Sequence, residues 1–298
     1  MSIYEANAKI NLFLEMIEKR NDGYHSLSSI MQSVSLCDIV DVGLVGSREG
    51  ISVSCDSDLI PTDQRNIVYK AARAFFDYSG ISAGVKIHIK KRIPSQAGMG
   101  GGSADGAAVI RALDELTATF YPEDLLRNIA AGVGADLPFC LYGGCREVAG
   151  IGEKNIEVLP SPDCSLLIVK TGECISTPAA YKALDAGHAD FESYKARDCF
   201  ELRESLKSDN HNFEKSLYNI FETVLPELAP KTLSVIEFLR ERSRAALLCG
   251  SGSAVFAVTE NEKESRSLRE SVISAYGDVY TTICRPVDTG IKMIREEI

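Results

Sequence analysis

A glycine-rich segment in the first half of the chain suits phosphate binding. It runs from Ser95 to Ser103, directly after Pro94, and it stands between a predicted strand and an alanine-rich predicted helix. Successive glycines let backbone N–H groups approach an anion without interference from a Cβ atom, and the N-terminus of a following helix adds unpaired N–H donors and the positive end of its dipole. A purely structural turn is the alternative. The strand-to-helix context favours phosphate binding.

This glycine-rich segment matches neither of two common phosphate-binding motifs. It is not a Walker A loop, because no Gly-Lys-Ser/Thr sequence closes it. It is not the dinucleotide-binding fingerprint, because Ser103 stands where the last glycine, counted from Gly98, would fall. The hydroxyl of Ser103 is either an ordinary N-terminal helix cap or a contact to phosphate or metal.

Two ionisable residues are candidates for proton transfer or charge stabilisation. Asp136 lies between Gly134 and Pro138 in a stretch too apolar to be a solvated charge run, and Lys9 lies on a predicted strand. Each has an ordinary alternative: Asp136 as a helix-capping or turn residue, and Lys9 as a solvated surface residue. Neither residue alone predicts a catalytic site.

Hydrophobic periodicity predicts the elements that must position these residues. Residues 6–16 alternate regularly, which predicts a strand with Lys9 and Asn11 side by side on one face. An Asp-Gly pair at residues 22–23 predicts a turn, after which residues 24–25 return beside that strand. The predicted strand therefore has polar side chains from two directions next to it.

The remaining segments predict two domains. Asn66 begins a helix that Gly80 ends, and a strand over residues 85–89 leads into the glycine-rich segment. The Pro-bearing stretch 159–162 is the predicted domain boundary, near residue 160. The second half mixes strands and helices, which predicts an antiparallel α+β layer; its elements are a strand over 166–170, helices across 178–242, strands over 245–249, 254–259 and 279–284, and a helix over 262–275.

Composition excludes several classes of protein. The 298 residues include 32 Lys and Arg against 42 Asp and Glu, for a net charge of −10, whereas general binding to nucleic acid or anionic membranes requires a clustered basic surface. The nine cysteines are scattered, with no C-x-x-C pair, so a disulfide framework or zinc site is not predicted. Residues 1–9 lack the basic and apolar segments of a targeting signal. We expect a cytoplasmic protein that binds neither nucleic acid nor membrane, as a monomer or homodimer.

Five segments, taken together and in order, resemble the motifs of one family. They are Lys9-Ile10-Asn11-Leu12, Asp22-Gly23-Tyr24-His25, Pro94 to Ser103, Gly134-Ala135-Asp136-Leu137-Pro138 and Cys249-Gly250-Ser251-Gly252-Ser253. The family is that of the GHMP kinases, which phosphorylate small molecules, and the resemblance spans nearly the whole chain. It implies an α+β, two-domain GHMP kinase fold, with an N-terminal nucleotide-binding α/β domain over residues 1–160 and a C-terminal ferredoxin-like α+β domain over 161–298.

The resemblance also implies an activity. The glycine-rich segment is shared by all GHMP kinases and indicates only ATP. The first, second and fourth segments together resemble the members that phosphorylate the 2-hydroxyl of a cytidine diphosphate ester of methylerythritol, in non-mevalonate isoprenoid synthesis. The implied cofactors are ATP and Mg²⁺, and the implied partner is that small-molecule substrate.

Roles for individual residues follow from the resemblance. Asp136 matches the family's catalytic base, and Lys9 matches the lysine that orients the substrate hydroxyl and offsets developing charge, which suits a reaction that depends on positioning and electrostatics. The implied nucleotide-binding residues are Pro94, Ser95, Gln96, Ala97, Gly98, Met99, Gly100, Gly101, Gly102, Ser103, Ala104 and, near the adenine, Asn66. The implied substrate-binding residues are Asn11, Tyr24, His25, Tyr181, Gly250 and Ser251, and the metal ligands are unknown, with Ser103 a candidate.

Aromatic residues are implied at the cytosine. Tyr24 and Tyr181 match the pair that sandwiches the base, and His25 can supply hydrogen bonds to its edge. A tyrosine simply packed on a helix is the alternative for Tyr181.

The chain departs from the family pattern after Ser103, where it reads Ala104-Asp105-Gly106-Ala107. A glycine inside a helix costs about 1 kcal/mol relative to alanine. Asp105 favours the helix dipole but repels phosphate if it points inward, so nucleotide affinity is the property affected. The alternatives are another GHMP kinase, acting on homoserine, mevalonate or a sugar, and a non-catalytic nucleotide-binding paralogue.

Overall fold

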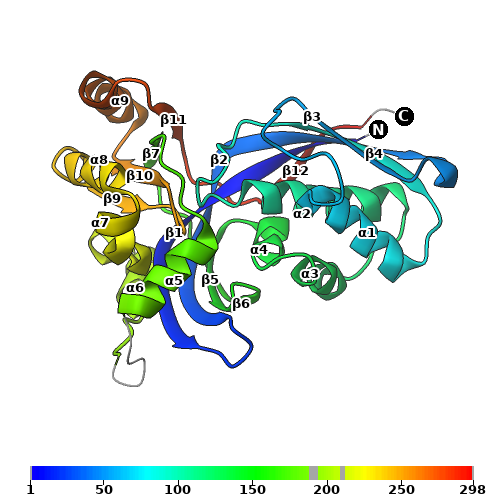
Figure 1. Cartoon of the computed structure of the whole chain (residues 1–298), viewed down its shortest axis with the longest axis horizontal. Helices are drawn as coiled ribbons and strands as arrows, with labels where there is room; N and C mark the ends of the chain where they lie inside the picture. The colour runs from blue at the N-terminus through cyan, green and yellow to red at the C-terminus, as the bar shows by residue number, and fades with distance from the viewer. Residues whose placement is uncertain (1, 188–193, 209–211, 297–298) are drawn as a thin grey trace.

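A long antiparallel hairpin forms the backbone of the fold. The computed structural model describes residues 2–187, 194–208 and 212–296. Strand β1 (Ser2–Lys19) and strand β2 (His25–Val45) pair from Ser2↔Val42 to Lys19↔His25. Figure 1 shows this hairpin running from the helices of the first half of the chain to those of the second. The predicted strand over residues 6–16 is the middle of β1.

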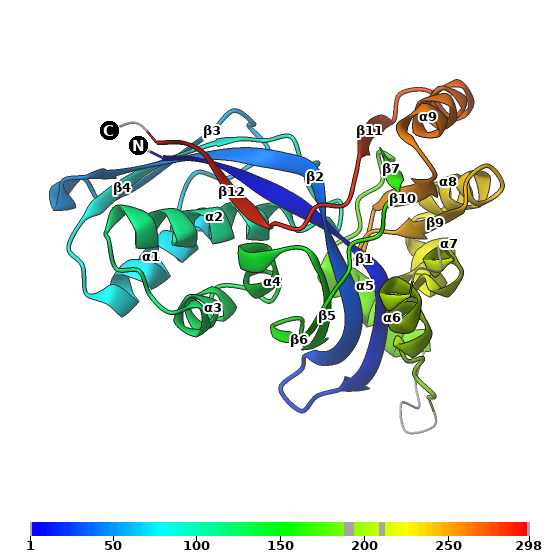
Figure 2. The same cartoon turned by 180° about the vertical axis from the view of Figure 1, so that it is seen from behind.

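The first sheet has the order β12-β1-β2-β4-β3, with β5 beside β2, β6 beside β5 and β8 beside β1. Helices α1 to α4 lie together on one face of this sheet, as Figures 1 and 2 both show. The strands are β3 (Ile51–Cys55), β4 (Gly84–Lys90), β5 (Cys145–Gly150), β6 (Lys154–Leu159), β8 (Tyr218–Asn219) and β12 (Ile291–Glu296), and the helices are the 3₁₀ turn η1 (Ser47–Glu49), α1 (Ile67–Ser79), α2 (Gly101–Leu116), α3 (Glu123–Ala131) and α4 (Leu137–Tyr142).

The second sheet is antiparallel, with the order β11-β7-β10-β9. Its strands are β7 (Ser165–Lys170), β9 (Ala245–Leu248), β10 (Ala254–Thr259) and β11 (Tyr280–Cys284). The helices of this half are α5 (Thr177–Gly187), α6 (Phe200–Lys207), η2 (Phe213–Ser216), η3 (Ile220–Val224), α7 (Leu225–Leu228), α8 (Pro230–Arg240) and α9 (Glu262–Tyr276). The predicted α+β class with two domains is confirmed.

The domain boundary near residue 160 stays a prediction. The second sheet begins at Ser165, whereas β12, at the other end of this half, pairs with β1 of the first sheet. Each half of the sequence therefore contributes to the first sheet.

Local signals explain the helix that precedes the site. The side chain of Asn66 caps α1 by accepting a hydrogen bond from the N–H of Val68 at 3.0 Å. Gly80 ends the helix in the left-handed conformation, at φ 68°. Both ends lie where the sequence predicted them. Among the described residues, no helix combines the length and the apolar character that crossing a bilayer requires.

Both faces of β1 are buried, which the alternating pattern alone does not predict. Lys9 is 5% exposed and Asn11 is 1% exposed, while Ile10 and Leu12 on the opposite face are also buried. The polar face is covered because segments distant in the sequence close over it. Lys9 is therefore not the solvated surface residue that its strand position also allowed.

Candidate active site

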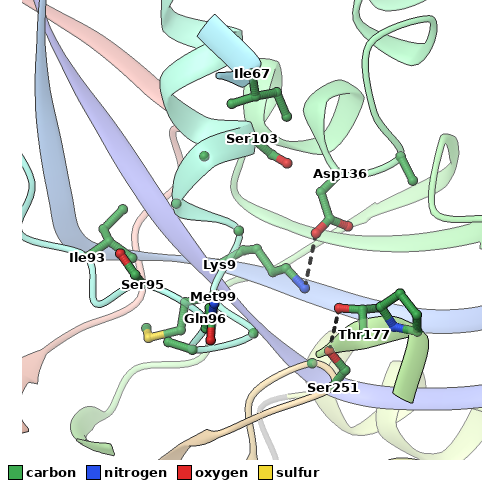
Figure 3. A pocket seen from close by; sticks show the side chains of 18 of the residues that line it. Lys9, Ile67, Ile93, Ser95, Gln96, Met99, Ser103, Asp136, Thr177 and Ser251 are labelled. Atoms are coloured by element: carbon green, nitrogen blue, oxygen red, sulfur yellow. Dashed lines mark hydrogen bonds and ion pairs between the residues drawn. The ribbon is translucent and has the colours of Figure 1, made fainter. Parts of the chain in front are cut away.

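The two candidate ionisable residues face each other across a cleft of about 1020 Å³. Nζ of Lys9 lies 3.5 Å from Oδ2 of Asp136, and Figure 3 shows the two side chains pointing toward one another. The Lys9 side chain is 6% exposed and that of Asp136 is 30% exposed. The carboxylate is therefore open to a ligand in the cleft while the ammonium behind it is shielded from solvent.

Asp136 occupies a capping position without acting as a cap. It is the N-cap residue of α4, and its side chain makes no capping hydrogen bond. Pro138, at the second position of that helix, has no N–H to offer. Asp136 thus stands at the position of a helix cap, as the alternative role predicted, but its carboxylate is directed toward Lys9 instead of capping the helix.

A chain of hydrogen bonds orients Lys9. Its ammonium donates to Oδ1 of Asn11 at 2.9 Å, and Nδ2 of Asn11 donates to Oγ of Ser29 at 2.8 Å. Ser29 in turn donates to the carbonyl of Phe13 at 2.6 Å. Sequence reasoning missed Ser29, because nothing in its local pattern sets it apart from the other serines at the start of β2.

The glycine-rich segment uses two of its glycines for close packing inside the protein. Gly98 has φ 73°, and a Cβ atom there would lie 1.9 Å from the carbonyl oxygen of Cys249. Gly100 has φ 68°, and a Cβ atom there would lie 3.0 Å from Cγ of Lys9. These glycines let the segment approach the loop at residues 249–253 and the Lys9 side chain. Gly100 is also the N-cap of α2, and it has no side chain to cap the helix. The first N–H groups of α2, beside the cleft, therefore receive no capping hydrogen bond from a side chain.

A buried charge cluster supports the start of α2. Nζ of Lys91 donates to Oδ2 of Asp105 at 2.8 Å and also to Asp38, whose Oδ1 accepts from the backbone N–H groups of Arg92 and Ile93. Asp105 is therefore paired with a lysine, and it is not a lone negative charge that would repel phosphate from the cleft. Its other oxygen, Oδ1, is buried without a hydrogen-bond partner in the described part of the chain. Burial and the charge of Asp38 raise the pKa of Asp105 to about 8.

At another part of the cleft, the residues implied to bind the base differ from the expected sandwich of Tyr24 and Tyr181. The ring of Tyr181 stacks on that of His25, with centroids 4.7 Å apart and planes 12° apart. His25 therefore covers one face of the Tyr181 ring. Nε2 of His25 lies 2.8 Å from Oδ1 of Asp185. Tyr24 lines the cleft but is 60% exposed. Sequence reasoning missed Asp185, which lies one helical turn after Tyr181, because no local pattern marks it.

Two hydroxyls link α5 to the loop at residues 249–253. Oγ1 of Thr177 and Oγ of Ser251 are 2.9 Å apart, as the dashed line in Figure 3 shows. Nδ2 of Asn219 donates to the carbonyls of Leu248 and Gly250, both at 2.8 Å. These bonds hold the loop at the edge of the cleft.

Most of the implied site residues line this one cleft. Ala104 does not: it is fully buried in the core of the first domain, because it faces inward from the first turns of α2. The implied residues that do line the cleft are Lys9, Asn11, Tyr24, His25, Asn66, Pro94, Ser95, Gln96, Ala97, Gly98, Met99, Gly100, Gly101, Gly102, Ser103, Asp136, Tyr181, Gly250 and Ser251.

The oxygen donors in the cleft suit a metal that arrives with phosphates. Mg²⁺ is usually bound by one or two protein carboxylates together with waters and phosphate oxygens. Ser103 and Asp136 supply a hydroxyl and a carboxylate to the cleft. Across residues 2–187, 194–208 and 212–296, no group of three or more His, Cys, Asp or Glu side chains could hold a metal. Oxygen donors of this kind fit a cation that binds together with phosphates.

Comparison with known proteins identifies the family. The model of the GHMP kinases N terminal domain matches residues 66–144, and the model of the GHMP kinases C terminal domain matches residues 201–278. The chain belongs to the GHMP kinase family and is a phosphotransferase.

Individual relatives are similar over nearly their whole length. The 4-diphosphocytidyl-2-C-methyl-D-erythritol kinase of Clostridium acetobutylicum is 35% identical, over 93% of this chain and 98% of that protein. A crystal structure of 4-(cytidine 5'-diphospho)-2C-methyl-D-erythritol kinase superposes with a TM-score of 0.77 at 30% identity, over 95% of this chain and 99% of the other. A homoserine kinase from Cytophaga hutchinsonii has the same TM-score at 18% identity, over 98% and 97% of the two chains, so that likeness shows the fold alone.

Proposed function

We propose that the protein transfers the γ-phosphoryl group of ATP to the 2-hydroxyl of 4-diphosphocytidyl-2-C-methyl-D-erythritol, a step of non-mevalonate isoprenoid synthesis. The observation that carries the reaction type is the Lys9–Asp136 pair, at 3.5 Å, in a cleft bordered by the glycine-rich segment. The relatives at 33–38% identity that bear this kinase's name support the substrate.

The proposed roles follow from where the groups lie. Asp136 is exposed enough to accept the proton of a substrate hydroxyl, and it carries no competing capping bond. Lys9, fixed by Asn11, places a positive charge next to that carboxylate and to the oxygen from which the proton departs. Phosphoryl transfer depends mainly on such positioning and charge stabilisation.

The nucleotide lies, in this proposal, along the glycine-rich segment. The first N–H groups of α2 bind its phosphates, and Asn66 at the start of α1 lies near the adenine. The hydroxyl of Ser103 would help to hold Mg²⁺ together with the phosphates, and the cation would supply charge neutralisation at the phosphoryl oxygens. The protein's part is to fix the acceptor hydroxyl between the γ-phosphoryl group and the base Asp136.

The base-binding region favours a cytidine substrate over the other GHMP kinase substrates. Tyr24, His25 and Tyr181 all line the cleft, and homoserine, mevalonate and simple sugars have no aromatic base on which such residues could stack. All nine cysteines, each within the described residues, are free thiols, which suits the reducing cytoplasm that we propose as its location.

Measuring ADP release with 4-diphosphocytidyl-2-C-methyl-D-erythritol tests the proposal. We expect saturable turnover with this substrate and none above background with homoserine, mevalonate or galactose. Turnover with one of those three and not with the cytidine ester would identify another GHMP kinase. ATP binding with no turnover on any of the four would identify a non-catalytic paralogue.

A further inference from the structure

The separation of Lys9 and Asp136 depends on the elements that carry them. At 3.5 Å, Nζ of Lys9 and Oδ2 of Asp136 are farther apart than the about 2.7–2.9 Å of a charge-assisted hydrogen bond. Lys9 is instead bonded to Asn11, and the Asp136 side chain makes no capping hydrogen bond to α4. The distance between the two charged groups is therefore set by where the backbones of β1 and α4 lie.

One residue near the end of the chain is hydrogen-bonded to both of these elements. Gly290, just before β12, donates its N–H to the carbonyl of Tyr142, the last residue of α4, at 3.1 Å. Its carbonyl accepts from the N–H of Asn7 in β1 at 2.8 Å, and the Asn7 side chain donates to the neighbouring carbonyl of Thr289 at 2.9 Å. Figure 2 shows β12 running along β1 and close to α4. Gly290 thus joins the strand and the helix that carry the charged pair.

The contact on the α4 side is a close approach of two backbones. A Cβ atom on Gly290 would overlap the carbonyl oxygen of Cys140 and lie 2.9 Å from the N atom of Gly143. Gly143 is itself at φ 66°, and a Cβ atom there would overlap the N atom of Gly290. Because only glycine at both positions allows this approach, a larger residue at position 290 must push the segment and the end of α4 apart.

A displacement at this end of α4 reaches the carboxylate at the other end. The helix, Leu137–Tyr142, has six residues, a length of about 9 Å. Residues 137–141 are all buried, and such a short, closely packed helix moves as a unit. A shift at Tyr142 therefore moves Asp136, and a misplacement of about 1 Å is enough to lower the rate about 100-fold.

We propose that Gly290 is a positioning residue for phosphoryl transfer: by bonding β1 and α4 through its own carbonyl and N–H, it holds Lys9 and Asp136 at the separation that the reaction requires. This inference rests on the function proposed above, which gives these two side chains their roles and gives none to Gly290. Gly290 does not line the cleft, so it acts on the reaction through the two elements that it joins.

Gly290→Ala tests this role by kinetics. The φ of Gly290 lies outside the left-handed region, so the added methyl group acts by displacing α4 and not by straining its own backbone. We expect kcat and kcat/KM to fall together, about 100-fold, with the KM values for ATP and the acceptor unchanged, because the site loses alignment and keeps its binding contacts. An unchanged kcat, or a loss that appears only as a raised KM, overturns the proposal.

Gly84→Ala is the matched control. Gly84 begins β4 in the same sheet, also outside the left-handed region, and a Cβ atom there would lie 2.6 Å from the carbonyl oxygen of Gly46. Both variants should unfold at a lower urea concentration than the wild type. Gly84→Ala should keep the wild-type kcat, because β4 pairs with β2 and β3 among the described strands. An equal loss of kcat in the two variants would show that lower stability explains the effect, which overturns the proposal.

Asn7→Ala decides the question if Gly290→Ala does not fold. It removes the side-chain bond to the carbonyl of Thr289 and leaves the backbone bond to Gly290 in place. We therefore expect a smaller fall in kcat, about tenfold, again with KM unchanged. A wild-type kcat in this variant contradicts the proposal.

Crystal structures of the wild type and of Gly290→Ala separate this inference from the proposed function. We expect a longer Lys9–Asp136 distance in the variant, and an unchanged distance overturns the inference whatever the acceptor. If the wild type phosphorylates homoserine, mevalonate or galactose and not the cytidine ester, the proposed substrate is wrong, and the same kinetic comparison is made with that acceptor. A wild type that turns over none of the four refutes the proposed function, and the two crystal structures then decide the inference.

Discussion

The carbonyl oxygen of Cys249 lies 1.9 Å from the position that a Cβ atom on Gly98 would occupy. This contact joins the glycine-rich segment of the first domain to a loop of the second sheet. Two backbone hydrogen bonds accompany it: the N–H of Ser253 donates to the carbonyl of Gln96 at 3.3 Å, and the N–H of Ala254 donates to that of Ala97 at 3.2 Å. The glycine-rich segment and the loop at residues 249–253 are thus fixed to each other by main-chain atoms.

Gly98→Ala should damage both stability and activity. The backbone must move to admit the methyl group, and the positive φ is unfavourable for alanine, so we expect a loss of more than about 1 kcal/mol in the free energy of unfolding. A displacement of the segment by about 1 Å should lower kcat about 100-fold. Gly172→Ala is the control, because nothing lies within 4 Å of the added Cβ. Urea unfolding and steady-state kinetics measure the two effects, and a variant with wild-type kcat would contradict this account.

Asp136→Asn should remove the proton acceptor and keep the shape of the site. We expect kcat to fall about 100- to 10,000-fold, the range for loss of a general base, while ATP still binds in a titration. Asp124→Asn, a change of an exposed carboxylate on α3, should retain activity. Turnover of Asp136→Asn close to that of the wild type would refute the assigned role.

Ser29→Ala tests the hydrogen-bond chain behind Lys9. Without the hydroxyl, Asn11 loses the acceptor that fixes which end of its amide faces the ammonium. We expect kcat to fall about tenfold and the free energy of unfolding to fall by about 1 kcal/mol, the usual effect of one lost buried hydrogen bond. The neighbouring Ser28→Ala, whose hydroxyl contacts Cys199, should leave kcat unchanged. Equal changes in kcat for the two substitutions would show that Ser29 has no specific part in orienting Lys9.

Asp105→Asn should change how stability depends on pH. Burial raises the pKa of Asp105 from 3.8 to about 8, so between these values the folded protein binds a proton that the unfolded chain has lost. The contribution of Asp105 to the free energy of unfolding is therefore fully present below about pH 4. It is lost as the pH rises toward about 8. Relative to the wild type, the variant should gain stability over this range, because asparagine cannot ionise.

Urea unfolding of both proteins across the pH range measures this difference. Asp77→Asn, at an exposed residue of α1, should run parallel to the wild type. A difference between Asp105→Asn and the wild type that stays constant with pH would show that Asp105 is ionised throughout.

Some of the fold and the site could be predicted because the signals are local. The Asn66 cap and the Gly80 stop depend on neighbouring residues, and they bound α1 as expected. The glycine-rich segment could be located for the same reason. The contacts that this segment makes inside the protein could not be predicted, because Gly98 packs against Cys249, a residue about half the chain away.

Other parts of the site depend on contacts that periodicity does not contain. Alternation placed Lys9 and Asn11 on one face of a strand, but it could not show that distant segments bury that face. Likewise, the sequence around Asp136 predicts a cap, and only its orientation toward Lys9 distinguishes it from one. Ser29 and Asp185 act through partners in other elements, and neither is marked by its own neighbours.

Strand β12 protects the strand that carries Lys9. It pairs with β1 over Ser2 to Ala6, and just beyond this ladder Asn7 donates its N–H to the carbonyl of Gly290 at 2.8 Å and its side chain to that of Thr289 at 2.9 Å. Without residues 289–296, this part of β1 would be an open sheet edge, with unpaired backbone groups able to join a strand of another molecule. Pairing with β12 thus protects the strand that carries Lys9 from edge-to-edge aggregation.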